Sequence, residues 1–409
     1  MSGGMPQGCH KDGGGGTVMG KMVGMEVSLA IAEAVKLANV DVVAAYPITP
    51  QTHIIERLAD FVANGELAAS YIPVESEHSA MSACLGSSAV GARTFTATAG
   101  QGMEFMHEVL YVASSMRLPM VMVVANRALS APLSIWGDHS DAMAVRDTGW
   151  IQIFAENGQQ AVDNVLCGFR IGEDRRILLP VMIHVDGFHV THMVEPILLP
   201  EQSAVDRFLP PYSYPLPLDP DKPVTMGAFG PPGIYTETKK AQYEHFKLVK
   251  NVVIECWEEF GKQFGRHYHP VEGYRNEDAK VLLFTMGSFS ETAMDAIDAL
   301  RTAGKKVGLV RLRLWRPFPS EEIRQIVKDA DVLIVLDRAL SIGGPGGPVC
   351  SDIRLALSDE ERKPKVVSFV GGLGGRDISV AGFEEIINRG IEIAKKGSRN
   401  EFEFFGVRE

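Results

Sequence analysis

The chain has 409 residues, of which 45% are hydrophobic and 22% are charged. At about 100 to 200 residues per domain, this length favours two or three domains with a sizeable core. Its 40 Lys and Arg residues against 51 Asp and Glu residues leave a formal net charge of -11. This composition excludes collagen-like, disordered and disulfide-dense chains, and an acidic chain without a long basic run does not suit nucleic acid or an anionic membrane.

The sequence contains no segment typical of a membrane span or a secretory signal. The longest apolar run, residues 118–125, is too short to cross a bilayer, and residues 1–23 lack the apolar segment of a signal peptide. We therefore expect a cytoplasmic protein that does not bind a membrane. The 5 cysteines are widely spaced without a Cys-x-x-Cys pair, which fits a reducing compartment. Because an iron–sulfur cluster needs about four thiolates, commonly in close groups, any such cluster must lie on another chain.

The first half of the chain alternates between helical and buried-strand patterns. Residues 1–23 include four consecutive glycines and predict a disordered leader. The elements predicted next, in chain order, are helix 25–38, strand 41–46, helix 51–63, strand 71–75, helix 78–90, strand 94–98, helix 103–116, strand 119–124 and, after a loop, strand 179–185. Buried strands that alternate with helices predict a doubly wound α/β domain with a mostly parallel sheet, which we place at residues 24–200.

The second half begins with a proline-rich segment. Prolines are dense from residue 196 to residue 232, where regular structure is not expected, so residues 201–274 are predicted to be a linker that includes a charged helix at 236–261. The elements predicted next are strand 280–286, helix 291–303, strand 307–311, helix 320–329, strand 332–336, strand 365–370 and helix 383–395. They indicate a second, smaller α/β domain at residues 275–396, followed by a tail at residues 397–409.

Four segments of the first domain directly follow predicted strands. They are residues 46–50, 75–78, 99–102 and 126–141. Ligands of doubly wound sheets bind at the carboxyl ends of the strands, and the carboxyl ends of parallel strands share one edge of the sheet. We therefore expect these four segments to form one rim that binds a ligand.

Two segments of this rim offer acidic and hydroxyl side chains. Glu75 and Glu77 precede a helix of small residues, and either they stabilise the helix start or one of them is a carboxylic acid held in an apolar crevice to donate or share a proton. In the turn at residues 46–50, prolines fix the backbone on either side of Thr49. This turn is either a rigid connection with a proline near the first helical turn, or a stiff loop that presents the Thr49 hydroxyl to a substrate oxygen.

The segment 126–141 adds an arginine and three candidate metal ligands. Arg127 ends a buried strand, where its guanidinium could form a structural ion pair or bind a substrate carboxylate. Asp138, His139 and Asp141 could bind a metal, but turn formation explains them better because no second cluster of ligands is evident. Packing or solvation similarly explains the other histidines considered: His184, His189, His192, His267 and His269. We therefore assign no metal site to this chain.

Eight short motifs form a set that is more specific than any one of them. They are Tyr46-Pro-Ile-Thr-Pro50, Val74-Glu-Ser-Glu-His-Ser-Ala80, Arg127-Ala-Leu-Ser-Ala-Pro132, Gly137-Asp-His-Ser-Asp141, Asp186-Gly-Phe188, Arg316-Pro-Phe-Pro319, Asp337-Arg-Ala-Leu-Ser341 and Gly372-Leu-Gly-Gly-Arg-Asp377. Their order and spacing, from about Gly24 to Lys395, resemble the alpha subunit of the multi-subunit 2-oxoacid:ferredoxin oxidoreductases of the pyruvate synthase type.

The resemblance implies a thiamine diphosphate enzyme. Such an enzyme oxidatively decarboxylates a 2-oxoacid with coenzyme A to an acyl-CoA and CO2, and it passes the electrons to iron–sulfur clusters. The first domain would resemble the pyrimidine-binding domain of thiamine enzymes, and the second the transketolase C-terminal domain. Glu77 matches the family's glutamate that bonds the pyrimidine ring nitrogen, while Thr49 and Arg127 match the residues that hold the 2-oxoacid by a hydroxyl and a guanidinium.

The expected cofactor-binding set of this chain is Glu77 with Tyr46, Pro47 and Gly102. The family binds the diphosphate and Mg²⁺ on a beta subunit through a Gly-Asp-Gly motif, and no Gly-Asp-Gly occurs in this sequence. The chain should therefore supply half an active site. The resemblance also implies a gamma subunit, a delta subunit with iron–sulfur clusters, a ferredoxin or a flavin- and NAD-linked subunit as electron acceptor, and a dimer of such heteromers.

The substrate and two rival functions stay open at this point. Pyruvate is favoured because it is the commonest substrate of the family, but a branched-chain 2-oxoacid or an aromatic one such as phenylglyoxylate would also fit Arg127. Trp136 either shapes the substrate pocket or only packs. The rival functions are a non-oxidative thiamine diphosphate decarboxylase or transferase subunit, and a non-catalytic scaffold subunit.

Overall fold

The computed structural model describes residues 20–397 and 402–408. The first sheet has the strand order β12-β6-β7-β5-β4-β2-β3, and β12 alone in this sheet runs antiparallel to its neighbour. The strands are β2 (Val42–Ala45), β3 (Ser70–Pro73), β4 (Thr94–Thr98), β5 (Val121–Asn126), β6 (Ile151–Phe154), β7 (Val181–Asp186) and β12 (Leu314–Arg316). Along β5, Val121 and Val123 pack on one face of the sheet and Met122 and Val124 on the other, because successive side chains of a strand point to opposite faces.

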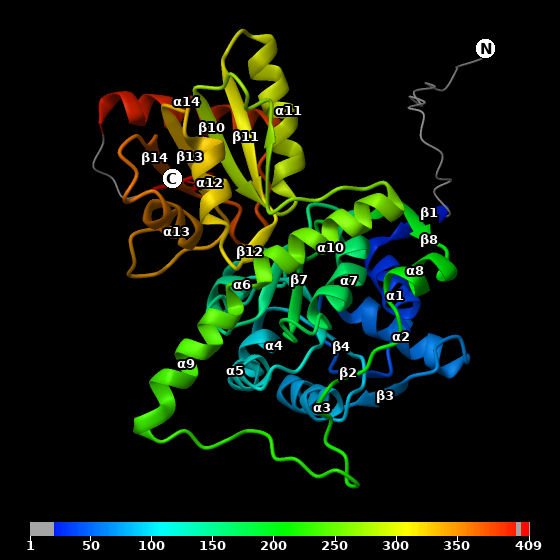
Figure 1. Cartoon of the computed structure of the whole chain (residues 1–409). Coiled ribbons are helices and arrows are strands. Elements are labelled where there is room, and N and C mark those ends of the chain that lie inside the picture. The colour runs from blue at the N-terminus through cyan, green and yellow to red at the C-terminus, as the bar shows by residue number, and fades with distance from the viewer. Residues whose placement is uncertain (1–19, 398–401, 409) are drawn as a thin grey trace, which may run out of the picture.

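Helices cover both faces of this sheet (Figure 1). One face packs against α1 (Val27–Leu37), α2 (Thr52–Ala63), α7 (Gly158–Gly172), α8 (Gln202–Phe208) and α10 (Val249–Phe264). The other packs against α3 (Glu77–Ala89), α4 (Gly100–Phe105) and α5 (His107–Ser115), with α6 (Ser140–Ala144) close by. This arrangement confirms the predicted doubly wound α/β domain.

The second sheet lies above the first in Figure 1 and has the order β15-β14-β13-β10-β11-β9. Its strands are β9 (Val271–Tyr274), β10 (Val281–Met286), β11 (Val307–Leu312), β13 (Val332–Asp337), β14 (Lys365–Val370) and β15 (Glu403–Phe404). Its helices are α11 (Phe289–Thr302), α12 (Ser320–Val327), α13 (Pro348–Ala356), the short 3-10 turn η1 (Leu373–Gly375) and α14 (Val380–Lys396). Helices α11 and α14 pack on one face and α12 and α13 on the other, as in the first domain.

A buried ionic cluster joins the two sheets. The Asp186 carboxylate, at the end of β7, accepts hydrogen bonds from the Ser288 backbone N–H and hydroxyl and lies 3.0 Å from His139 Nε2 and 2.5 Å from Arg338 Nη1. Burial alone would raise the pKa of Asp186, but Arg338 and His139 hold that pKa far below its usual range. Three of the motifs noted in the sequence, at residues 137–141, 186–188 and 337–341, therefore fasten one domain to the other.

The chain crosses between the two domains twice more than the sequence predicts, because β12, which follows β11 of the second sheet, pairs with β6 of the first sheet before the chain returns to β13. Strand β9 is a further unpredicted strand, and it lies at the edge of the second sheet. Both strands are too short to show the run of apolar residues from which strands are predicted. The division into domains at residues 24–200 and 275–396 stays a proposal.

Strand β6 and helix α7 lie in a segment that was predicted to be a loop before residue 179. Helix α7 is almost wholly buried although it contains polar residues, because each of these is paired. Asp163 accepts hydrogen bonds from Arg266 and from the Tyr268 hydroxyl, and Asn164 Oδ1 accepts one from Trp257 Nε1. Such buried polar pairs interrupt the apolar pattern from which helices are predicted.

The proline-rich segment contains regular structure, so the prediction that residues 196–232 have none was wrong at its start. β8 (Val194–Pro200) pairs antiparallel with β1 (Gly20–Glu26), and α8 follows it. Prolines are tolerated in β8 because this ribbon has two strands and each strand has a free edge. Residues 20–23 of the expected leader belong to β1, while residues 1–19 lie outside the described residues.

Three other boundaries differ from the prediction. The helix expected at 236–261 is two helices, α9 (Pro232–Phe246) and α10, and the helix expected at 103–116 is divided between α4 and α5. Strand β15 pairs with β14, so part of the expected tail belongs to the second sheet. No helix within the described ranges is long and apolar enough to cross a membrane.

Candidate functional site

The four predicted rim segments meet at one edge of the first sheet. β3, β2, β4 and β5 are parallel neighbours, so their carboxyl ends lie together. Arg127 Nη1 donates a hydrogen bond of 3.0 Å to the backbone oxygen of Thr49. The side chain of Arg127 packs on Gly100, where a Cβ would lie 3.1 Å from Arg127 Cδ. Segments that are far apart in sequence thus form one continuous surface.

Glu77 is a buried carboxylate at this rim. It is the first residue of α3, it is 7% exposed, and no group in the described part of the chain donates a hydrogen bond to its carboxylate. Gly102 of α4 faces it, and a Cβ on Gly102 would lie 2.7 Å from Glu77 Oε1 and 2.6 Å from Thr98 Oγ1. The absence of a side chain at Gly102 leaves the space that the Glu77 carboxylate occupies. Because Glu77 makes no hydrogen bond within the described residues, its carboxylate can bind a partner that is not part of this chain.

Glu75 has a different environment from Glu77. It is exposed, and its carboxylate accepts a hydrogen bond of 2.5 Å from the Ser79 hydroxyl, which lowers its pKa. Ser76 is the N-cap of α3, and its hydroxyl accepts a hydrogen bond from the Ser79 backbone. The first turn of the helix is thus stabilised by Ser76 and Glu75, and the Glu77 carboxylate is not needed for it.

Arg127 is held with part of its guanidinium free. The residue is 7% exposed, and its Nε donates to the Ser134 backbone oxygen at 3.0 Å while Nη1 donates to Thr49. Burial lowers the pKa of Arg127, and the nearby negative charges of Asp141 and Glu77 oppose this shift. Nη2 makes no hydrogen bond within the described residues, so the guanidinium can still bind a carboxylate.

Asp141 holds the backbone of two rim segments in place through hydrogen bonds. Its buried carboxylate accepts hydrogen bonds from the backbone N–H groups of Gly100 and Arg127 and from Asn126 Nδ2, at 2.8 to 3.0 Å. Burial raises the pKa of Asp141 to about 7. Asp138 and His139 point elsewhere, to Gly374 and Asp186 respectively. The three residues therefore do not converge on a common metal position. The role of Asp141 in holding the rim is not predictable from sequence, because it depends on contacts between distant loops.

The turn at residues 46–50 contributes exposed groups. Thr49 and Pro47 are exposed and Tyr46 is half-buried. Gln51 Nε2, which the sequence analysis did not single out, donates to the backbone oxygen of Tyr46 at 2.8 Å and to that of Ala97 at 3.3 Å. Gln51 thus fixes this turn to the end of β4.

Trp136 lies where the two domains meet. Its side chain is half exposed and packs on the Phe188 ring, with 4.5 Å between the ring centroids. Gly375 of the second domain is so close that any side chain there would overlap Trp136. Trp136 therefore packs against both domains while half of its side chain stays exposed.

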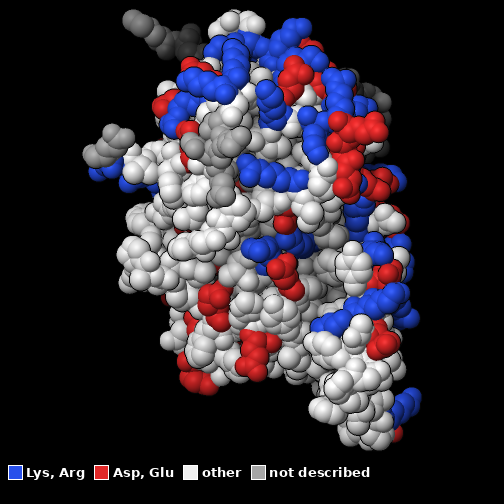
Figure 2. Space-filling view, turned by 90° about the vertical axis from the view of Figure 1, so that its left-hand side faces the viewer, with Lys and Arg blue, Asp and Glu red and all other residues white. Residues whose placement is uncertain are grey.

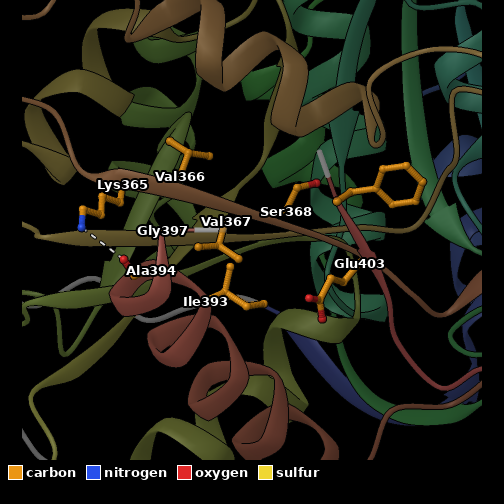
Figure 3. Close-up of a pocket in the computed structure, with 9 residues that line it drawn as sticks. Lys365, Val366, Val367, Ser368, Ile393, Ala394, Gly397 and Glu403 are labelled. Carbon is orange, nitrogen blue, oxygen red and sulfur yellow. Dashed lines mark hydrogen bonds between the residues drawn. The ribbon is translucent and has the colours of Figure 1, made fainter. Parts of the chain in front are cut away.

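A separate cavity lies in the second domain, beside β14 and the end of α14 (Figure 3). It has a volume of about 300 Å³ and is lined by residues of β14, the end of α14 and β15, including Lys365, Val367, Ile393 and Glu403. The Lys365 ammonium already donates to the Ala394 backbone oxygen at 3.1 Å. None of the predicted site residues reaches this cavity, so it does not belong to the rim.

Substitution of Gly102 by Ala should remove most activity without unfolding the protein. The added methyl group would push the Glu77 carboxylate away, and a shift of about 1 Å at a reacting group costs about 100-fold in rate. Gly86→Ala in α3 is the matched control, because a Cβ at Gly86 meets nothing within 4 Å. Turnover and melting temperature of both variants would check this, and equal turnover would contradict it.

The stability of the chain should fall at acid pH through His184. This residue of β7 is fully buried, and burial, together with the nearby His139, lowers its pKa to about 3 from the usual 6.5. Asn126 Nδ2 lies 3.1 Å from His184 Nδ1, which must be unprotonated to accept this hydrogen bond. Between pH 6.5 and 3 the unfolded chain binds more protons at this residue than the folded chain, so the free energy of unfolding decreases as pH falls, by up to ~1.4 kcal/mol per pH unit.

Urea unfolding of the wild-type chain and of His184→Asn at several pH values in this range measures the effect. The variant should be less stable at neutral pH but lose less stability on acidification. Parallel pH dependences of the two proteins would show that His184 does not titrate on unfolding.

Comparison with known proteins agrees with this geometry. Residues 33–257 match the family described as pyruvate flavodoxin/ferredoxin oxidoreductase, thiamine diphosphate-binding, and residues 279–383 match pyruvate:ferredoxin oxidoreductase core domain II. Pyruvate synthase subunit PorA of Methanocaldococcus jannaschii is 50% identical over 375 residues, which cover 90% of this chain and 94% of the relative. Ketoisovalerate oxidoreductase subunit VorA of Pyrococcus abyssi is 42% identical over 371 residues, which cover 90% of this chain and 93% of that one.

A solved structure shares the fold. The structure of 2-oxoglutarate:ferredoxin oxidoreductase from Magnetococcus marinus superposes with a TM-score of 0.70 at 20% sequence identity, and the match covers 91% of this chain and 65% of that chain. The resemblance that the eight motifs predicted is confirmed. The chain belongs to the pyruvate:ferredoxin oxidoreductase family, as an alpha subunit.

Proposed function

We propose that this chain supplies the pyrimidine side of a thiamine diphosphate active site in a 2-oxoacid oxidoreductase. The enzyme decarboxylates a 2-oxoacid with coenzyme A to an acyl-CoA and CO2 and transfers the electrons to iron–sulfur clusters of partner subunits. The observation that carries the proposal is the buried residue Glu77, whose carboxylate has no hydrogen-bond donor in the described chain and faces Gly102, which has no side chain. A ring nitrogen that shares a proton with Glu77 would satisfy this carboxylate.

The residues of the rim have separate roles in this proposal. Thiamine diphosphate, when bound, supplies the electron sink for decarboxylation. Glu77 holds the proton at the pyrimidine nitrogen, and Tyr46, Pro47 and Gly102 line the same position. Thr49 and Arg127 bind the 2-oxoacid through a hydroxyl and a guanidinium, and this fits the exposed Thr49 and the free Nη2 of Arg127.

The other half of the active site would come from a partner. A beta subunit would bind the diphosphate and Mg²⁺, since this sequence contains no Gly-Asp-Gly. A gamma subunit and a delta subunit with iron–sulfur clusters would complete the heteromer, which would dimerise. Ferredoxin, or a flavin- and NAD-linked subunit in its place, would accept the electrons, and the complex would work in the cytoplasm.

The surface supports docking of partner subunits. On the face in Figure 2, charged side chains gather on the second domain at the top, while the lower part of the face is largely uncharged. Large apolar side chains are exposed on α4, α5 and α9 of the first domain: Phe105, Tyr111, Val112, Tyr235 and Tyr243. No residue of helix α9 is fully buried, and Phe246 at its end packs only partly against the core. Interfaces between proteins are poor in charge and rich in aromatic residues at their centre.

Pyruvate is the substrate that we propose. Identity is 50% to a pyruvate synthase subunit and 42% to a ketoisovalerate oxidoreductase subunit. Trp136 is half exposed, and its backbone oxygen accepts a hydrogen bond from the Ala128 N–H beside Arg127. Its ring would narrow the space beyond the carboxylate and favour a small 2-oxoacid. Branched-chain and aromatic 2-oxoacids are therefore expected to be poorer substrates.

Dye reduction by the purified native complex tests this proposal. Reduction of a viologen dye would be measured with coenzyme A and, side by side, pyruvate, 2-oxoglutarate, 3-methyl-2-oxobutanoate, indolepyruvate and phenylglyoxylate. We expect coenzyme A-dependent reduction that is strongest with pyruvate. Decarboxylation without an electron acceptor, in a complex without iron–sulfur subunits, would instead identify a non-oxidative decarboxylase or transferase.

A further inference from the structure

Three potential metal ligands meet on the first domain outside the proposed site. Glu26 ends β1, His53 lies in the first turn of α2, and His192 lies between β7 and β8. One ligand atom of each lies within 4.8 Å of the others, and His53 Nδ1 is 2.6 Å from Glu26 Oε1. The two imidazole rings lie with 4.8 Å between their centroids. The sequence does not predict this cluster, because its three residues are far apart in the chain.

The surroundings of His192 orient its ring. Its Nδ1 lies 2.8 Å from the Thr191 hydroxyl, and that hydroxyl also accepts a hydrogen bond from the Phe188 backbone N–H. The Phe188 ring packs on His192 with 4.6 Å between centroids. A hydrogen bond from Nδ1–H to an oxygen fixes the ring and leaves Nε2 free to bind a metal, as is common for histidine ligands.

The charge and exposure of the cluster also suit a cation. Glu26 brings a carboxylate, and its side chain is 22% exposed while that of His53 is 44% exposed, so an ion can enter from solvent.

We propose that Glu26, His53 and His192 bind a divalent transition-metal ion of the Zn²⁺ class, with one coordination position open to solvent. Two imidazole nitrogens and one carboxylate oxygen are a common ligand set for zinc, whereas Mg²⁺ and Ca²⁺ prefer oxygen ligands. Zn²⁺ binds such donors at about 2.0 to 2.2 Å, so the three donor atoms, which lie within 4.8 Å of one another, would have to rearrange around a common ion.

The position of the cluster gives the ion a role. α2 starts directly after the turn that carries Thr49, and Phe188 contacts both His192 and Trp136. A bound ion would therefore fasten the β1–β8 ribbon and the segment around His192 to the start of α2. It would hold the substrate side of the rim in place without contacting the substrate.

The test is Zn²⁺ titration of the purified complex after treatment with a chelator, followed by X-ray absorption at the zinc edge. The variants are His192→Gln and Glu26→Gln, and the control is His269→Gln, which removes an exposed histidine close to Glu272 in the second domain. Melting temperatures would show that the variants are folded, and the two variants remove different ligands, so one folded variant is enough for a decision.

We expect one tight Zn²⁺ per alpha chain in the wild type and the control, and at least about tenfold weaker binding in either variant, since loss of even an outer-shell partner costs about 10- to 100-fold. The absorption spectrum should show two imidazole nitrogens at about 2.0 to 2.1 Å. Equal zinc affinity in the wild type and the variants would overturn the proposal. So would displacement of the bound Zn²⁺ by an equal concentration of Mg²⁺, or a spectrum without imidazole ligands.

Discussion

Replacement of Glu77 by Gln should lower turnover of the assembled complex at least about 100-fold, because loss of a general acid or base typically costs 10² to 10⁴ in rate. Glutamine keeps the volume of the side chain in the space beside Gly102, so folding and assembly should not change. It cannot hold or share the proton at the ring nitrogen. Coenzyme A-dependent dye reduction at saturating pyruvate, with thiamine diphosphate in excess, measures the effect.

Glu75→Gln is the matched control for this experiment. Glu75 lies two positions earlier but is exposed and bonds only within its own turn, so the variant should keep nearly full activity. If Glu77→Gln kept turnover within about twofold of the wild type, no proton transfer would depend on it. The chain would then be a non-catalytic scaffold subunit.

Replacement of Arg127 by Ala should raise KM for the 2-oxoacid and lower kcat/KM by about 10- to 100-fold, the effect of losing a charge-assisted hydrogen bond of about 1.5 to 3 kcal/mol. Its guanidinium bonds two backbone oxygens of the rim and leaves Nη2 for a substrate carboxylate. Steady-state kinetics with pyruvate as the varied substrate would separate KM from kcat.

Arg93→Ala is the contrasting variant. Arg93 is 4% exposed, and its guanidinium bonds both carboxylate oxygens of Glu173 at 2.6 and 2.8 Å and the backbone oxygens of Ala38 and Pro210. All three nitrogen atoms of this guanidinium thus donate hydrogen bonds within the chain. Arg93→Ala should lower the melting temperature and leave KM unchanged, whereas an unchanged KM in Arg127→Ala would show that Arg127 is structural too.

The sequence predicts most of the fold because the central strands are short runs of apolar residues. β4, β5, β7, β10 and β13 are buried along nearly their whole length, and such runs are visible without any knowledge of contacts. Helix α7 was missed because Asp163 and Asn164 are buried with partners from distant segments. Strand β8 was missed because prolines normally argue against a strand. They are tolerated in β8 because it pairs only with β1 in a two-stranded ribbon.

Some features of the candidate site were likewise predicted from the sequence, and others were not. The position of Glu77, Thr49 and Arg127 at strand ends follows from the alternation of strands and helices, and so does their place on one rim. The supporting contacts of Gln51 and Asp141 do not follow from it, because they join loops whose approach is decided by the folded chain. The cluster of Glu26, His53 and His192 was missed for the same reason.

The most direct test of the central claim, that this chain is half of an active site, is reconstitution from separate subunits. Coenzyme A-dependent viologen reduction with pyruvate and thiamine diphosphate would be measured for this chain alone, for the partner subunits alone and for the mixture. The account predicts activity in the mixture only, with the mixture that contains Glu77→Gln at least about 100-fold slower. Equal activity of the partner subunits without this chain would contradict it.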